Sequence, residues 1–396
     1  MMPSSQPAPT NWAALISVLL AGIGMSMHVG KVPPAVSLVS SELEMSLIAS
    51  GWLLSLFALL GAGTGSGVGR LVDRLGQKRT LIFGLSCTVL GSAAGSFAPA
   101  SSLLLASRAL EGIGFVAVVV AAPALIFREC QPKDHRLAFG LWSTWMPAGA
   151  ASMMALSPLL LAAGGWRANW QVSAGLTLLA LLAALFLVSP DPELHSNRPR
   201  GRLRDLLAMP APWILAASFC FYSMAFQTVF GFLPSYLAVE QHLEPALAAR
   251  LTALAILANV AGNLSAAWFI RHRLARWQVI LIASLVMGLS AFGIFSADLS
   301  LPLRYGLCLA FSAVGGVIPA IIFIAVPLFA PTPAHVGAMG GMIVQGLSIG
   351  QLAGPPILAF LVHGTGSWAA APYFIALLCL IVLALSLGLR AIERLR

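Results

Sequence analysis

The sequence predicts an all-α membrane protein with twelve transmembrane helices in two pseudo-symmetric six-helix bundles. Three observations support this fold class: an apolar composition, twelve long apolar stretches and an internal repeat. Of the 396 residues, 59% are hydrophobic and only 9% are charged, whereas a soluble domain carries about 25% charged residues. The composition argues against a soluble enzyme, a coiled coil, a disordered chain and a nucleic-acid-binding protein.

Twelve stretches are long and apolar enough to cross a bilayer, whose core of about 30 Å takes about 20 apolar residues of helix. Leu, Ala, Val, Ile and Phe fill them on all faces, as in helices surrounded by lipid or by other helices. The stretches are 11–36, 45–69, 80–98, 102–127, 137–162, 168–189, 212–238, 247–269, 278–297, 303–329, 336–362 and 368–389.

Basic residues mark one set of the loops between these stretches. Most of the 22 Lys and Arg residues fall in five clusters that each follow an even-numbered stretch: 70–79, 128–136, 198–204, 271–276 and 390–396. Positive residues collect on the cytoplasmic side of a membrane, so we expect an inner (plasma) membrane protein with both termini in the cytoplasm. The basic residues that give the net charge of +9 therefore orient the chain in the membrane and do not indicate a nucleic-acid partner. Between Tyr305 and Leu389 there is no Lys or Arg, so the last three stretches are oriented by their order alone.

The two halves of the chain repeat each other. A shift of 197 residues pairs Gly65 with Gly262, Arg74 with Arg271, Gly149 with Gly346 and Pro158 with Pro355. We therefore expect an N-terminal six-helix bundle at 1–189, a cytoplasmic linker at 190–210 and a C-terminal six-helix bundle at 211–396. Repeats of this kind are common in secondary transporters.

The first stretch ends with His28 and Lys31, which lie three residues apart. In one interpretation, Lys31 simply extends its ammonium group to the outer membrane interface. In the other, both side chains face an internal cavity, where they attract an anionic group or where His28 joins Glu111 in a proton relay.

The loop after the second stretch carries a specific motif, which runs from Gly69 to Thr80 and includes Gly69, Asp73, Arg74, Gly76 and Arg79. It resembles the signature G-x-L-x-D-R-x-G-x-[RK]-[RK] of the major facilitator superfamily, at the expected place. The resemblance implies a twelve-helix fold in which this loop is a cytoplasmic latch that stabilises the outward-open state. The alternative is an ordinary basic cytoplasmic loop.

The fourth stretch contains Arg108, Glu111, Gly112 and Gly114, which resemble the superfamily element R-x-x-Q-G-x-G with Glu in place of Gln. Charges inside a bilayer are costly and mark functional sites by default. Arg108 and Glu111 lie three residues apart on one helical face and can neutralise each other, which is also what a purely structural ion pair does. Among the carboxylates of the sequence, only Glu111 lies well inside a predicted stretch. We therefore expect Glu111 to carry a proton, with His28 as a partner.

Further candidates come from the seventh and eleventh stretches. The seventh is rich in aromatic residues and contains one amide, and the resemblance implies that stretches 1, 4, 7 and 10 line the central cavity. In the eleventh, Gln345 either bonds across helices or faces this cavity. The expected cavity residues are Lys31, Arg108, Tyr222, Phe226, Gln227 and Gln345.

The fifth stretch distinguishes branches of the superfamily. It lacks the G-P-x-x-G-G element of the drug:proton antiporters, which argues against the multidrug branch. The run Gly140 to Thr144, with Gly165-Trp166-Arg167 after the stretch, loosely resembles the cyanate- and nitroimidazole-type permeases over about 30 residues.

These patterns predict a monomeric secondary active transporter of a small organic solute with an anionic group, working by alternating access and coupled to protons. The alternatives are a proton-driven drug or metabolite efflux pump, an uncoupled facilitator, and a transporter-shaped sensor that moves nothing. The sequence has no nucleotide-binding loop or nucleophile elbow, and its five cysteines are isolated. We therefore expect no enzyme activity, no cofactor and no metal.

Overall fold

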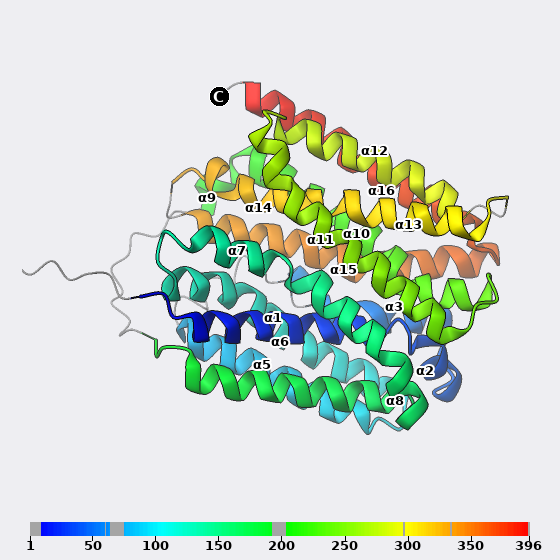
Figure 1. Cartoon of the computed structure of the whole chain (residues 1–396). Coiled ribbons are helices and arrows are strands. Elements are labelled where there is room, and N and C mark those ends of the chain that lie inside the picture. The colour runs from blue at the N-terminus through cyan, green and yellow to red at the C-terminus, as the bar shows by residue number, and fades with distance from the viewer. Residues whose placement is uncertain are drawn as a thin grey trace, which may run out of the picture.

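The computed structural model describes residues 9–59, 61–63, 75–191, 203–295, 298–332 and 335–394, and these form long helices joined by short connections (Figure 1). The helices are α1 (Trp12–Gly30), α2 (Val36–Glu42), α3 (Leu47–Ser55), η1 (Leu56–Ala58), α5 (Gln77–Ser96), α6 (Ser101–Glu129), α7 (His135–Ser143), α8 (Trp145–Leu187), α9 (Leu203–Leu207), α10 (Pro210–Val239), α11 (Pro245–Arg271), α12 (Arg276–Ile294), α13 (Leu301–Gly315), α14 (Val317–Phe329), α15 (Val336–Thr365), η3 (Trp368–Ala370) and α16 (Ala371–Arg394). Within these residues the prediction of an all-α protein is confirmed.

Nine helical segments within the described ranges are long and apolar enough to cross a membrane. One of them, α8, contains most of the fifth and of the sixth predicted stretches, and its backbone leaves the helical conformation at Gly164 and Gly165. The third predicted stretch is α5, which is rich in Gly, Ser and Thr. The second corresponds to α3 and η1, and residues 60 and 64–69 of that stretch lie outside the described part of the chain.

Other predicted stretches are divided in the structure, and the fifth is divided between α7 and α8 at Thr144. The first, predicted to reach residue 36, ends as α1 at Gly30, and the short helix α2 follows it. The tenth is split into α13 and α14 at Gly316. A Cβ atom at Gly316 would collide with the backbone oxygen of Asn259, so glycine allows α11 to approach this break closely.

Helix packing repeats between the two halves. The helix α1 packs against α8 as α10 packs against α15, and α5 packs against α8 as α12 packs against α16. Gly149 lies against the backbone oxygen of Ile23, and Gly346, its counterpart in the repeat, lies against that of Ala216. Glycine at these positions lets the helix backbones touch. The sequence repeat therefore corresponds to a repeated packing pattern.

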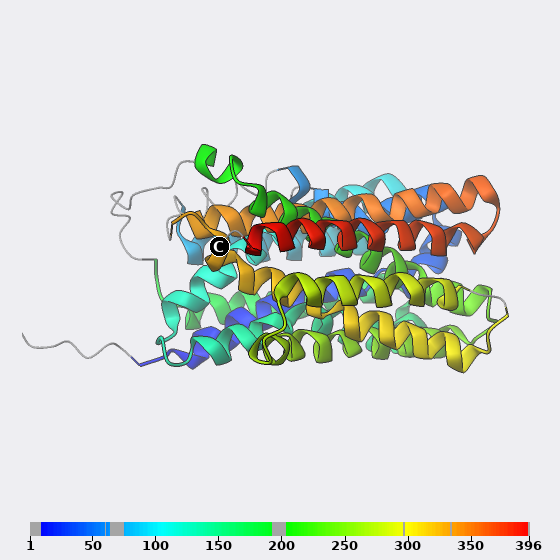
Figure 2. The same cartoon turned by 90° about the horizontal axis from the view of Figure 1, so that it is seen from above.

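Figure 1 shows the helices α1 to α8 grouped on one side and α10 to α16 on the other. The described ends of the chain lie toward the same end of the molecule in both views (Figures 1 and 2). Near α2, at the opposite end, a buried apolar cluster joins the halves: it includes Leu53 and Leu54 from the first half and Phe232, Leu358 and Val362 from the second.

Candidate functional site

The structure brings together the four titratable or charged side chains that the sequence singled out in stretches one and four. The helix α1 carries His28, Lys31 directly follows its last residue, and α6 carries Arg108 and Glu111. Lys31 and Arg108 are 0% exposed, Glu111 is 1% exposed and His28 is 3% exposed. The interpretation in which Lys31 extends to the outer interface is wrong, because the side chain turns inward.

Glu111 is the centre of this cluster. Its Oε1 atom accepts a hydrogen bond from Lys31 Nζ at 2.6 Å, and its Oε2 atom accepts one from Arg108 Nη1. His28 Nδ1 lies 3.6 Å from Oε1. The expected pairing of Arg108 with Glu111 is confirmed, whereas the bond between Lys31 and Glu111 was not predicted. Its signal in the sequence was the presence of opposite charges in two apolar stretches.

Lys31 makes three polar contacts, one for each N–H of an ammonium group. Besides Glu111, its Nζ atom lies 3.0 Å from His28 Nδ1 and 2.8 Å from Ser92 Oγ. Ser92 donates in turn to the backbone oxygen of Trp170 at 2.8 Å, and the indole ring of Trp170 lies 4.6 Å from Nζ. On the far side of the imidazole, His28 Nε2 lies 2.8 Å from Thr177 Oγ1.

Arg108 closes the other side of the cluster. Its Nε donates to the backbone oxygen of Leu53 at 3.2 Å, and its Nη1 also donates to that of His28 at 3.1 Å. The guanidinium carbon lies 5.4 Å from the centre of the Phe57 ring. The remaining nitrogen, Nη2, is buried without a hydrogen-bond partner among the described residues.

The cluster holds two cations and one carboxylate, so it carries one excess positive charge when His28 is neutral. Every contact given above comes from α1, α3, η1, α5, α6 or α8, all within the first half of the chain. Burying charges costs several kcal/mol per ion unless they are paired and hydrogen-bonded, as an order of magnitude. A buried site of this kind is a strong candidate for function.

The aromatic candidates lie together in the second half. Tyr222 and Phe226 on α10 have ring centres 5.9 Å apart, and the rings of Phe226 and Phe230 are 4.5 Å apart. The hydroxyl of Tyr222 accepts a hydrogen bond from Asn259 Nδ2 at 3.2 Å. Gln227 is 6% exposed.

Gln345 links the two halves. Its Nε2 atom donates to the backbone oxygen of Ala62 at 3.0 Å, so it bonds across helices, which is one of the two roles expected from the sequence. The candidates therefore fall into a charged group in the first half, an aromatic group in the second, and an amide between them.

Part of the expected latch lies outside the described residues, namely Gly69, Asp73 and Arg74. Gly76 has φ +95°, a backbone conformation that favours glycine, and it leads directly into α5. The backbone N–H groups of Lys78 and Arg79 donate to the carboxylate of Asp191, at 2.8 and 3.1 Å.

Asp191, which the sequence did not single out, also pairs with Arg128 at 2.9 Å. Burial alone would raise the pKa of its carboxyl group, but the two N–H groups and Arg128 outweigh burial and hold the pKa below its ordinary value of 3.8. Asp191 thereby joins the expected linker to the first turn of α5 and to the end of α6.

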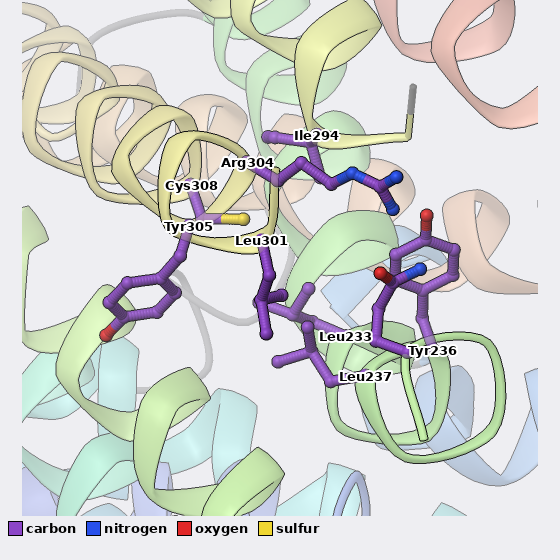
Figure 3. Close-up of a pocket in the computed structure, with 9 residues that line it drawn as sticks. Leu233, Tyr236, Leu237, Ile294, Leu301, Arg304, Tyr305 and Cys308 are labelled. Carbon is purple, nitrogen blue, oxygen red and sulfur yellow. The ribbon is translucent and has the colours of Figure 1, made fainter. Parts of the chain in front are cut away.

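A small cavity lies in the second half between α10, α12 and α13 (Figure 3). Leucines and Ile294 line it together with Tyr236, Arg304 and Cys308. Arg304 Nε donates to the backbone oxygen of Leu299 at 2.7 Å. The lining includes none of the cavity residues expected from the sequence, so we do not assign the solute to it.

Comparisons with known proteins agree with this architecture. The family model described as Major Facilitator Superfamily matches residues 14–343. A bacterial homologue of the human lysosomal transporter Spinster, solved in an inward-facing and occupied conformation, has a TM-score of 0.76 at 14% identity, covering 98% of both chains. That likeness concerns the fold.

Relatives of this chain carry different names. The putative niacin/nicotinamide transporter NiaP of Bacillus subtilis is 25% identical over 388 residues, which are 93% of this chain and 94% of that protein. The puromycin resistance protein of Streptomyces alboniger is 32% identical over 184 residues, 46% of this chain and 36% of that protein. The methyl viologen resistance protein of Salmonella typhimurium is 29% identical over 43% of this chain and 34% of its own length. The chain thus spans about a third of these two resistance proteins.

Proposed function

The chain belongs to the major facilitator superfamily, and we propose that it is a secondary active transporter that moves a small organic solute by alternating access and couples this movement to protons. In such transporters two halves rock about a site near the middle of the membrane. The observation that carries the proposal is the buried cluster of His28, Lys31, Arg108 and Glu111, which contains titratable groups away from water.

We infer that the moving bodies are the bundles at 1–189 and 211–396, joined by the linker at 190–210 and acting as a monomer. The basic clusters that follow the even-numbered stretches support cytoplasmic termini in the inner (plasma) membrane. The loop from Gly69 to Arg79 is the proposed latch. The bonds of Lys78 and Arg79 to Asp191 support a role for this loop in tying the linker to the first bundle.

We propose that Glu111 and His28 couple transport to protons. Glu111 bonds Lys31 and Arg108 at the same time, so a proton added to or removed from this group of side chains changes the balance of buried charge. Because unpaired buried charges are costly, such a change favours another arrangement of the helices. This is the physical link that coupling requires between protonation and conformation.

We propose a solute with an anionic group and an aromatic or apolar body. The excess positive charge beside Lys31 and Arg108 suits an anion once a rearrangement exposes these residues, and Tyr222 and Phe226 suit a ring. Gln227 and Gln345 offer amide groups to polar atoms of the solute. The name of the relative that matches over most of both chains, a putative niacin/nicotinamide transporter, is compatible with a small aromatic acid.

Two alternatives keep transport but change its nature. The resistance names of the puromycin and methyl viologen relatives favour a proton-driven efflux pump for drugs or metabolites. An uncoupled facilitator would use the same fold without proton movement. Thermal-shift measurements with nicotinate, its neutral amide nicotinamide and the dication methyl viologen separate the solute classes. Stabilisation by methyl viologen alone would reject the anionic solute.

Coupling is tested in proteoliposomes that contain a trapped pH indicator. We expect an inward or outward pH gradient to change the rate of flux of the solute selected by thermal shift, and to drive its accumulation. Equal rates with and without the gradient would refute coupling. The variant Glu111→Gln, with flux measured per folded protein, tests the facilitator alternative, because a uniporter would keep its net downhill flux.

A further inference from the structure

We propose that the proton exchanged by the buried cluster is carried by Lys31 and its neighbour His28, whereas Glu111 remains ionised as their fixed counter-ion. This inference deepens the proton coupling proposed above and rests on it. It changes the role of Glu111 from proton carrier to positioning residue.

The geometry around Lys31 leaves room for one proton on the side that faces His28. A protonated lysine can only donate hydrogen bonds, so its contact of 3.0 Å with His28 Nδ1 requires Nδ1 to be the acceptor. The imidazole is then neutral, with its proton on Nε2, which donates to Thr177 Oγ1 at 2.8 Å. A second proton on Nδ1 would place two N–H groups against each other. Lys31 and His28 therefore share one proton between Nζ and Nδ1.

Glu111 is the least favourable place to add a proton. Each of its oxygens faces a cation, and Arg108 does not lose its charge in proteins. Protonation of Glu111 would raise the charge of the cluster from one to two excess positive charges, in a place without exposed surface. Removal of a proton from Lys31 leaves Arg108 paired with Glu111 and no excess charge. Burial therefore favours the exchange at Lys31.

The surroundings supply no other charge. Besides the two groups on α1 and the two on α6, α5 contributes the Ser92 hydroxyl and α8 contributes Thr177 and the Trp170 ring. The α3 and η1 segments contribute a backbone oxygen of Leu53 and the ring of Phe57. Within the part of the chain that the structure describes, the four named residues thus set the charge of the site.

The proton has a short route through this geometry. The N–H bond of Lys31 breaks as one forms on His28 Nδ1, which leaves a neutral amine and an imidazolium. The imidazolium then loses its Nε2 proton toward the Thr177 hydroxyl, which passes its own hydrogen to water when that side opens. Lys31 lies just beyond the end of α1, and His28 lies one turn earlier. With the N-terminus in the cytoplasm, the end of α1 faces the outer side of the membrane. A proton that passes from Lys31 to His28 therefore moves inward.

Nuclear magnetic resonance tests the proposal without a transported solute, because the chain has lysine at three positions, 31, 78 and 133. In full-length protein labelled with ¹⁵N at lysine Nζ, the variants Lys78→Arg and Lys133→Arg assign the remaining signal to Lys31. We expect the Lys31 signal to change from ammonium to amine across the pH range in which the wild type couples flux to protons. The ¹³C signal of the Glu111 carboxyl group, assigned with Glu111→Gln, should stay at its ionised position.

The opposite result, a constant ammonium signal for Lys31 and a titrating carboxyl signal for Glu111, would overturn the proposal. Flux provides a second test: Lys31→Arg keeps the charge but cannot release it, so we expect pH-driven accumulation to be lost while exchange of solute across the membrane is still measurable. Lys133→Arg, at an exposed position, is the matched control. Coupled flux in Lys31→Arg would contradict the role of Lys31.

His28→Gln keeps an acceptor for Lys31 but cannot take up a proton. We expect it to slow proton movement by about tenfold or more, since a positioned acid–base group typically contributes about 10² to 10⁴ in rate. An unchanged rate would remove His28 from the route. If instead the wild type shows no proton flux while Lys31 still titrates, the proposed function fails and the assignment of the proton-binding site stands.

Discussion

Lys31 and Glu111 are 80 residues apart in the chain, yet their Nζ and Oε1 atoms lie 2.6 Å from each other in a site where both side chains are buried. This ion pair joins α1 to α6 within the first half. Together with Arg108 it leaves one excess positive charge away from water. The proposed coupling of protons to transport depends on that imbalance.

Loss of the central carboxylate should destabilise the protein. Glu111→Gln leaves Lys31 and Arg108 without a counter-ion, and removal of one partner from a buried ion pair costs about 3–5 kcal/mol. We expect a clearly lower thermal unfolding midpoint in detergent. Glu240→Gln, at an exposed position, should leave the midpoint where it is. An equal midpoint in wild type and Glu111→Gln would show that the carboxylate does not stabilise the cluster.

Close contact between helices should make Gly149 intolerant of a side chain. A Cβ atom there would collide with the backbone oxygen of Ile23, so Gly149→Leu must push α1 away from α8. Overpacking of this kind typically costs about 1–3 kcal/mol. We expect a lower unfolding midpoint and a lower yield of monodisperse protein. Gly175→Leu is the control, because a Cβ atom at Gly175 meets nothing within 4 Å. Equal behaviour of the two variants would refute the contact.

Asp191 should make stability depend on pH in the acid range. Its pKa is lower in the folded protein than its ordinary value of 3.8, so the stabilisation is complete above that ordinary value. It is lost as the pH falls through the lowered pKa, because protonation weakens the bonds to Lys78, Arg79 and Arg128. We expect Asp191→Asn to be less stable than the wild type at pH 7 by about 1 kcal/mol, because the amide keeps an oxygen acceptor but loses the negative charge that faces Arg128 and the N-terminal turn of α5.

The measurement is the unfolding midpoint of wild type and Asp191→Asn from neutral to acid pH. The two curves should approach each other as the pH falls below the ordinary pKa, and meet below the lowered pKa of the folded protein. A difference that stays constant with pH would mean that the charge of Asp191 has no role in tying the linker to α5.

The aromatic group of α10 should affect solute affinity. Phe226 is half-buried between the rings of Tyr222 and Phe230, and an aromatic contact is worth about 0.5–1.5 kcal/mol beyond its buried area. For Phe226→Ala we expect the half-saturation concentration of an aromatic solute to rise about fivefold, with a smaller effect for a non-aromatic one. Phe186→Ala, at an 83% exposed position, is the control. Equal half-saturation concentrations would exclude Phe226 from the solute site.

The sequence predicts the parts of this structure that depend on local composition. Long apolar stretches specify the membrane helices, and the spacing of Arg108 and Glu111 places them on one face of α6. The repeat of Gly149 and Gly346 predicts equivalent close contacts. These features follow from hydropathy, from helical periodicity and from the small size of glycine, all of which are visible in a single stretch of sequence.

Features that depend on contacts between distant segments were not predictable. Nothing in the local sequence indicates that the Lys31 side chain turns toward Glu111 and not toward the outer interface. The same apolar helix precedes Lys31 in either case. Asp191 acts through N–H groups of α5 that precede it by more than 100 residues. The helix α2 has seven residues, too few for a periodic signal, and the close approach of Gly316 to Asn259 joins two separate helices.

We propose that this buried cluster couples solute transport to protons. Internal pH can be measured in proteoliposomes that contain wild type or Lys31→Arg, while the solute selected by thermal shift moves down its gradient. We expect a pH change for the wild type, whose sign distinguishes symport from antiport, and none for Lys31→Arg. Solute flux through the wild type without any change of internal pH would contradict it.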